Sequence, residues 1–152
     1  MQNAKLLNYL HLHFIVFIWG FTAVLGALIS IDALGLVWFR MSIASLLILA
    51  WVGYKKIPLK FSKKTMLVFL LAGAVIAMHW LAFFGAIKTA NVSITLAIMS
   101  TGSFFTAFLE PIFYKRKVIW YEVVFGLVVV LGLYVIFQVE GDYSWGILLA
   151  LI

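Results

Sequence analysis

Apolar runs long enough to cross a membrane follow one another along this chain, and the polar segments between them are short. One run lies within residues 88–117, KTANVSITLAIMSTGSFFTAFLEPIFYKRK, between Asn91 and Pro111. A membrane-spanning helix needs about 20 mostly apolar residues. The runs lack the strict alternation of polar and apolar residues that barrel strands show. The sequence therefore predicts an all-α fold, a polytopic membrane helix bundle.

Composition supports this fold class. Of the 152 residues, 66% are hydrophobic and 11% are charged, and the mean hydropathy is +1.20. Ordinary globular chains are about half apolar and a quarter charged, so a soluble domain of this size could not bury so much apolar surface. The sequence contains no cysteine, which rules out disulfides, thiolate metal sites and cysteine nucleophiles.

The net charge of +6 comes from basic residues that cluster between the apolar runs. The most basic loop, residues 54–64, contains five lysines: Lys55, Lys56, Lys60, Lys63 and Lys64. A second basic segment occupies residues 114–117. Because cytoplasmic loops carry an excess of Lys and Arg, we predict that both loops and the N-terminus are cytoplasmic, in the cell (inner or plasma) membrane. We interpret the charge as an orientation signal and expect no nucleic-acid partner.

Five complete spans are predicted, joined mostly by short turns that make sequential helices antiparallel neighbours. They cover residues 11–30, 34–53, 65–87, 91–111 and 118–138. In the first span Gly20, Ala23 and Ala27 share one face, which allows another helix to approach closely.

The chain ends within what is predicted to be a sixth helix. An acidic outer loop with Glu140 and Asp142 precedes the apolar run that starts near Trp145. This run is far shorter than a complete span. We therefore divide the chain into a five-helix repeat, residues 1–140, and the outer loop with the truncated start of the next helix, residues 141–152.

A polar stripe is predicted along the fourth span. Its members recur at steps of three, four and seven residues, which a helix places roughly on one side: Ser93, Ser100, Ser103, Thr106 and Glu110. Such a side faces partner helices or a wet pathway, so the hydroxyl groups either join helices or contact a ligand. For Glu110 the expected partners are Lys115, Arg116 or the lysine-rich loop, and a coupling or substrate role is the alternative.

Two further ionisable side chains lie inside predicted spans. Arg40 is about six residues from the outer end of its span and His79 about eight, which places them roughly 9 and 12 Å deep. At these depths they could line one outward-facing cavity. In the alternative interpretation, Arg40 reaches the headgroups and His79 bonds a helix carbonyl. His11 and His13 are too few for a metal site.

No enzyme is predicted. We expect no second acidic residue near Glu110 for a paired-carboxylate mechanism, and neither a glycine-rich phosphate loop nor a G-x-S-x-G motif is present. No cofactor and no metal are implied.

Four segments carry a resemblance to a known family. They are FIWGFTAVLGALI, LVWFRMSIASLLI, HWLAFFGAIKTANVSITLAIM and EPIFYKRKVIWYEVVFGLVVVLGLYVIF. Through their order and spacing the chain resembles the first repeat of the EamA family of the drug/metabolite transporter (DMT) superfamily. The resemblance implies ten helices in two inverted five-helix repeats with substrate between them. Arg40 matches the family's second-helix arginine, and Trp19, Trp80 and the segment from Ser100 to Ser103 match cavity-facing regions.

The resemblance therefore implies a membrane transporter, a carrier, exporter or permease of small metabolites, present as its N-terminal half. Its expected partners are the lipid bilayer, a small-molecule substrate, and a second EamA repeat or a second copy in a dimer. The residues of the hypothetical substrate pathway are Arg40, His79, Trp80, Trp19, Ser100, Ser103 and Glu110. The alternative is a non-transporting membrane-embedded partner subunit or an inactive truncation product.

Overall fold

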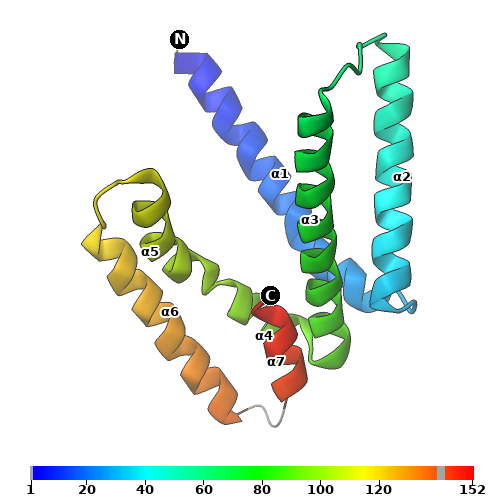
Figure 1. The fold of residues 1–152 in the computed structure, drawn as a ribbon. Coiled ribbons are helices and arrows are strands. Elements are labelled where there is room, and N and C mark those ends of the chain that lie inside the picture. The colour runs from blue at the N-terminus through cyan, green and yellow to red at the C-terminus, as the bar shows by residue number, and fades with distance from the viewer. Residues whose placement is uncertain (1, 140–142) are drawn as a thin grey trace.

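The computed structural model describes residues 2–139 and 143–152, and all regular structure in these ranges is α-helical (Figure 1). The helices are α1 (Gln2–Leu28), α2 (Ala33–Tyr54), α3 (Lys63–Thr89), α4 (Val92–Met99), α5 (Gly102–Tyr114), α6 (Trp120–Val139) and α7 (Ser144–Ala150). The predicted fold class, a helical membrane bundle, is confirmed.

Four segments of the described chain are long and apolar enough to cross a membrane. They are Lys5–Leu28, Ala33–Tyr54, Lys63–Thr89 and Val92–Tyr114. The fifth predicted span, residues 118–138, corresponds to α6, of which Trp120–Val135 is an apolar helix. The predicted acidic loop with Glu140 and Asp142 lies outside the described residues.

Polar side chains define where three of the helices begin. The side-chain oxygens of Asp32, Ser62 and Asn91 accept hydrogen bonds from the backbone N–H groups at the starts of α2, α3 and α4, at 2.8, 3.1 and 2.8 Å. Each such cap satisfies a backbone donor that the helix itself cannot pair, and is worth about 1 kcal/mol. Residues with short polar side chains therefore determine where the helix after each of these turns begins.

The fourth predicted span is interrupted between α4 and α5. At the break the Thr101 N–H group bonds the Ile98 carbonyl, one residue closer than in an α-helix, and the Phe105 N–H group bonds the Thr101 carbonyl. The Ser100 and Thr101 hydroxyl groups donate to carbonyls three residues earlier, at 2.5 and 2.6 Å. Such back-bonding competes with the helical ladder and bends helices. By contrast, α5 continues through Pro111 to Tyr114.

The buried side chains belong mainly to the helix ends in the lower part of Figure 1, away from the α2–α3 and α5–α6 loops. One cluster joins α1, α2 and α3 through Ala23, Leu36, Val37, Phe83, Phe84 and Ile87. A second joins α4 and α6 through Ile94, Ile98 and Leu133, with α7 packed against it. The Lys88 ammonium also donates to the Ile29 carbonyl just after α1. The helices are thus held together at one end.

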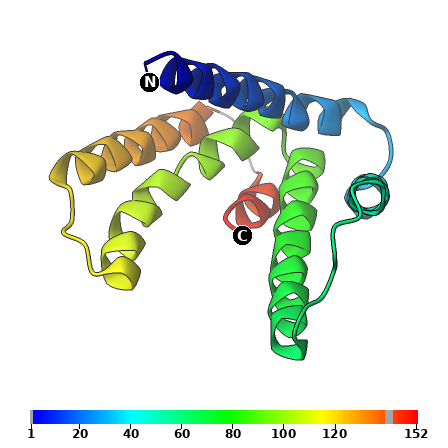
Figure 2. The ribbon, with the colours of Figure 1, turned by 90° about the horizontal axis from the view of Figure 1, so that it is seen from above.

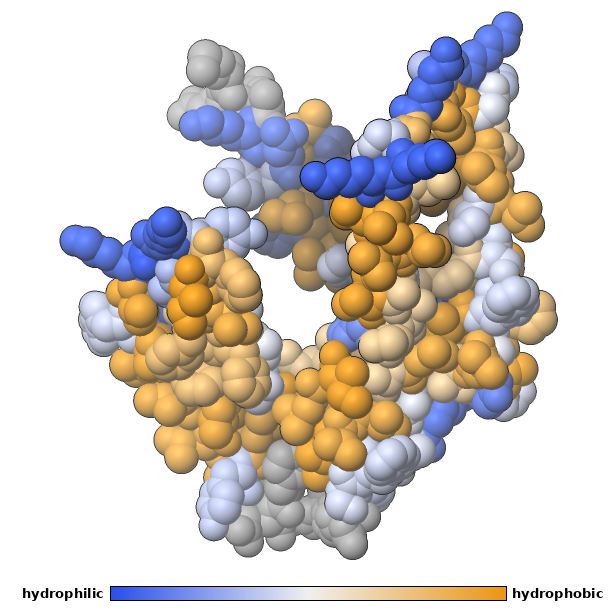
Figure 3. Space-filling model, viewed as in Figure 1, coloured by the Kyte–Doolittle hydropathy of each residue, from blue (hydrophilic) through white to orange (hydrophobic). Residues whose placement is uncertain are grey.

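At the other end the helices diverge. The two loops that contain the lysine clusters lie at this end (Figure 1), where hydrophilic side chains gather (Figure 3). Seen from above, α7 lies between α3 and the α4–α5 segment (Figure 2), and it contacts both α3 and α4. Its Gly146 approaches the α3–α4 turn so closely that an added Cβ would lie 2.5 Å from the Ala90 Cβ.

Candidate functional site

A cavity of about 340 Å³ lies between α1, α3 and α4. Its lining consists mainly of aromatic and small side chains: Trp19, Gly20, Thr22 and Ala23 of α1, His79, Trp80 and Phe83 of α3, and Leu96 and Met99 of α4. The structure thus brings together three residues of the predicted pathway, Trp19, His79 and Trp80. We call this space the aromatic cavity.

The α3 wall of the aromatic cavity is rigidly supported. Trp80, Phe83, Phe84 and Ile87 follow one another at helical spacing, which places them on one face of α3. Phe84 is 1% exposed, and its ring stacks under Trp80 with ring centroids 5.7 Å apart. Helix α1 passes close to the same ring at Gly26, where an added Cβ would collide with Phe84. The Trp80 indole is therefore positioned by a buried aromatic layer.

A smaller cavity of about 100 Å³ lies between α2 and α3 and shares Trp80 with the aromatic cavity. It is lined by Val37, Arg40, Met41, Ala44, Trp80 and Phe84. The Arg40 Cζ atom lies 4.9 Å from the Trp80 ring centroid and 5.3 Å from that of Phe84, which is cation–π geometry. Arg40 and His79 were expected to line one cavity. That was one of two interpretations of the sequence, and in the structure the two residues line separate cavities that have Trp80 in common.

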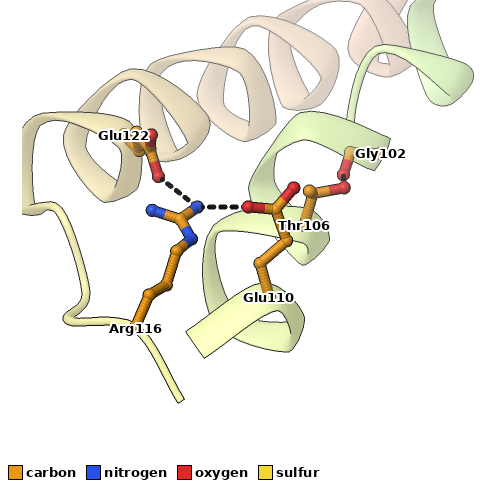
Figure 4. A network of polar contacts seen from close by, with 5 residues as sticks. All are labelled: Gly102, Thr106, Glu110, Arg116 and Glu122. Carbon is orange, nitrogen blue, oxygen red and sulfur yellow. Dashed lines mark hydrogen bonds and ion pairs between the residues drawn. The ribbon is translucent and has the colours of Figure 1, made fainter. Parts of the chain in front are cut away.

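A third cavity, of about 460 Å³, lies between α5 and α6 near the basic end. Three members of the predicted stripe, Ser103, Thr106 and Glu110, line it. The Glu110 carboxylate forms an ion pair with Arg116, with 2.7 Å between Oε2 and Nη2 (Figure 4). Arg116 is one of the partners that the sequence suggested for Glu110.

A second carboxylate completes this network, and sequence reasoning missed it. Glu122 Oε2 lies 3.1 Å from the same Arg116 Nη2 atom (Figure 4). The inference that Glu110 has no acidic residue near it was therefore wrong, because the turn between α5 and α6 brings the first turn of α6 beside the end of α5. A carboxylate at a helix start, just after a basic cluster, was the available signal.

The three charges form a structural ion-pair network. The hydrogen bond to Glu122, followed by the attraction of both carboxylates, raises the pKa of Arg116 above its ordinary value. The guanidinium therefore stays charged at every physiological pH. Side-chain exposures of 28% for Arg116, 43% for Glu110 and 32% for Glu122 leave the network in contact with solvent, which limits its strength.

Three hydroxyl groups of the predicted stripe, those of Ser100, Ser103 and Thr106, bond within their own chain segment. Ser103 donates to the Ser100 carbonyl at 2.9 Å, and Thr106 donates to the Gly102 carbonyl at 2.7 Å. Figure 4 shows the second of these bonds. Ser100 is exposed and lines none of the three cavities described above. The break between α4 and α5 thus separates Ser93 and Ser100 from the three members of the stripe on α5.

Family comparison gives this architecture its context. No curated protein and no solved structure matches the chain. The profile of the EamA-like transporter family matches residues 7–138, which include α1 to α5 almost completely and most of α6. The match covers most of the chain, and the helices long and apolar enough to span a membrane agree with it. The chain belongs to the EamA-like transporter family.

Proposed function

We propose that this chain transports small metabolites and that the aromatic cavity is its substrate-facing surface. The observation that carries the proposal is the convergence of Trp19, His79 and Trp80, from two different helices, on one cavity of about 340 Å³. Ligand pockets commonly measure about 300–1,000 Å³ and combine apolar walls with a few polar groups. Membership of a transporter family favours transport over a role as a non-transporting partner.

The divergence of the helices supports a pathway that opens toward the basic end. Helices α1 and α3 separate toward that end (Figure 1). The space between the α2–α3 pair and the α5–α6 pair is open in the space-filling view (Figure 3). The two packed clusters lie toward the opposite end. Because basic loops stay on the cytoplasmic side, we assign the open end, with residues 54–64 and 114–117 and the N-terminus, to the cytoplasm.

One wall of the pathway has to come from outside these helices. Trp19 is 68% exposed although it lines the aromatic cavity. An indole ring in such a place is covered either by lipid or by further protein. We propose that the covering wall is a second five-helix repeat or a second copy of the chain, since transporter sites commonly lie at the interface of two repeats.

Cysteine labelling tests whether the aromatic cavity is a wet pathway, and the absence of native cysteine removes background labelling. Thr22→Cys places a thiol in the cavity, whereas Val24→Cys places one about 200° away around the same helix at nearly the same depth. We expect a membrane-impermeant methanethiosulfonate, applied to inside-out membrane vesicles so that it reaches the cytoplasmic side, to modify Thr22→Cys at least ten times faster, because thiolates form readily only in water.

The same modification should stop transport. We expect cells that produce the Thr22→Cys protein to change the metabolite content of their medium, measured by mass spectrometry, and to lose this change after treatment with the membrane-permeant methyl methanethiosulfonate. Val24→Cys serves as the matched control and should keep the change. Equal labelling of both positions, or transport that survives complete labelling at Thr22→Cys, would contradict the proposed pathway.

A further inference from the structure

Arg40 is a cation for which the described part of the chain provides no anion. That part contains three acidic side chains. Asp32 accepts the cap hydrogen bond of the Gly35 N–H group, and Glu110 and Glu122 both bind Arg116. Within the described ranges, the contacts recorded for the Arg40 guanidinium are the two cation–π contacts. A charged group within a membrane span is costly and usually has a partner.

The geometry of these contacts leaves the hydrogen-bonding groups of Arg40 available. A guanidinium that stacks on aromatic rings uses its face, while its N–H donors lie in its plane and point outward. The Trp80 and Phe84 ring centroids lie 4.9 and 5.3 Å from the Arg40 Cζ atom, within the range of such stacking. The fork of in-plane donors matches the two oxygens of a carboxylate or phosphate group. The rings hold the fork in place, so little side-chain entropy is lost when an anion binds.

We propose that Arg40 binds the negatively charged group of the substrate, and that the substrate is a small organic anion, a carboxylate or phosphate attached to a flat apolar body. This inference rests on the function proposed above. The cavity at Arg40, about 100 Å³, suits a headgroup, and the aromatic cavity, about 340 Å³, suits the apolar body. Because Trp80 borders both cavities, a ligand whose headgroup is at Arg40 contacts Trp80 with its body.

Charge selectivity follows from this arrangement. An anion gains charge-assisted hydrogen bonds to Arg40 in addition to its ring contacts. A neutral molecule of the same shape gains only the ring contacts, and a cation is repelled. Lipid headgroups also contain phosphate, so the experiment has to separate a soluble anion from a bound lipid.

The test measures binding of three compounds with one apolar body to the purified full chain in a maltoside detergent, by titration calorimetry. The compounds are phenylacetate, 2-phenylethanol and phenethylammonium. We expect phenylacetate to bind about tenfold more tightly than 2-phenylethanol, and phenethylammonium to bind most weakly. Arg40→Gln should abolish the difference between phenylacetate and 2-phenylethanol, and Arg40→Lys should keep part of it.

The controls separate this inference from the proposed function. Retained binding of 2-phenylethanol by Arg40→Gln shows that the cavity is still folded, and Lys60→Gln, which removes a charge from the basic loop, should leave all three affinities unchanged. If the native chain binds none of the compounds, the proposed substrate surface fails. If it binds all three equally, or Arg40→Gln keeps the preference, the anion inference alone fails.

A second arm concerns the lipid. The titration with phenylacetate is repeated in nanodiscs of phosphatidylglycerol and in nanodiscs of a neutral glycolipid. Equal affinity in both supports a soluble anion as the ligand of Arg40. Binding in the glycolipid that disappears in phosphatidylglycerol assigns Arg40 to the phosphate of a lipid and overturns the inference.

Discussion

At the residue scale, Trp80 connects the parts of the candidate site. Its ring stacks on the buried Phe84, lies near His79 with 5.9 Å between ring centroids, and supports the Arg40 guanidinium. Indole is the aromatic group that binds cations best. A change at Trp80 therefore alters both cavities, whereas a change at Arg40 alters charge and leaves the ring layer in place.

The role of Arg116 in the ion-pair network can be tested by a single substitution. In the Arg116→Gln variant Glu110 and Glu122 lose their common partner and repel each other across the α5–α6 turn. We expect the unfolding temperature, followed by tryptophan fluorescence in detergent, to fall slightly at low salt. At about 1 M salt, where the screening length is roughly 3 Å, the difference should nearly vanish.

Lys117→Gln is the matched control, because it removes the same charge from the same loop at an exposed residue. It should leave the unfolding temperature almost unchanged. A decrease equal to that of Arg116→Gln would mean that the net charge of the loop, rather than the ion-pair network, stabilises the α5–α6 hairpin.

At the scale of elements, glycine determines how closely α5 and α6 pack. An added Cβ at Gly126 would lie 2.5 Å from Cδ2 of Phe104 and 3.0 Å from its Cα atom. Since a backbone atom cannot move aside easily, we expect Gly126→Ala to lower the free energy of unfolding by about 1–3 kcal/mol. Thermal or denaturant unfolding in detergent measures this change.

Gly132 on the same helix provides the comparison, because nothing lies within 4 Å of the Cβ position there. Gly132→Ala should be neutral or should stabilise α6 by up to about 1 kcal/mol through helix propensity. If both variants are destabilised equally, Gly126 is not needed for the close packing of α5 against α6.

The break between α4 and α5 illustrates what segment hydropathy misses. The whole stretch Val92–Tyr114 is apolar enough to span as one helix. Yet consecutive serine, threonine and glycine residues at 100–102 supply competing hydroxyl donors and a residue with poor helix propensity. The resulting bend turns α5 toward α6, so that Ser103, Thr106 and Glu110 face the α5–α6 cavity while Ser100 does not.

At the scale of the whole molecule, the lysine loops predict its orientation in the membrane. Single cysteines at Phe61 in the basic loop and at Ser30 in the α1–α2 turn, both exposed, report on the two ends. In intact cells an impermeant thiol reagent should label Ser30→Cys and not Phe61→Cys. Replacing the five loop lysines by glutamine should make part of the Phe61→Cys population reactive, because the orientation signal is weakened.

Permeabilised cells supply the control for that experiment, since both cysteines should react once the membrane is open. If Phe61→Cys is labelled in intact cells while the protein still has all five loop lysines, the orientation is the reverse of the one proposed. The cysteine that reacts only after permeabilisation marks the end of the bundle, open or packed, that faces the cytoplasm.

Much of the architecture was predictable from hydropathy and charge. The helical class, the position of the spans and the aromatic composition of the α1–α3 region follow from runs and spacings in the sequence. The close contacts did not follow. Gly20 and Ala27 were expected to share the packing face with Ala23, but the structure uses Ala23 and Gly26, against Phe84, and has nothing within 4 Å of the Cβ position at Gly20. The crossing angle of two helices decides which small residues meet, and one helix cannot specify it.

The sequence by itself determined that the chain forms membrane helices and which loops carry the basic charge, because hydropathy and charge act segment by segment. Only the tertiary structure decided which polar groups meet: Glu122 with Arg116 and Glu110, and Arg40 with the Trp80 and Phe84 rings. These contacts depend on a helix break, a turn and the close passage of α1 over Phe84. The break and the turn are local, but which side chains they bring together depends on packing between helices, which no single segment encodes.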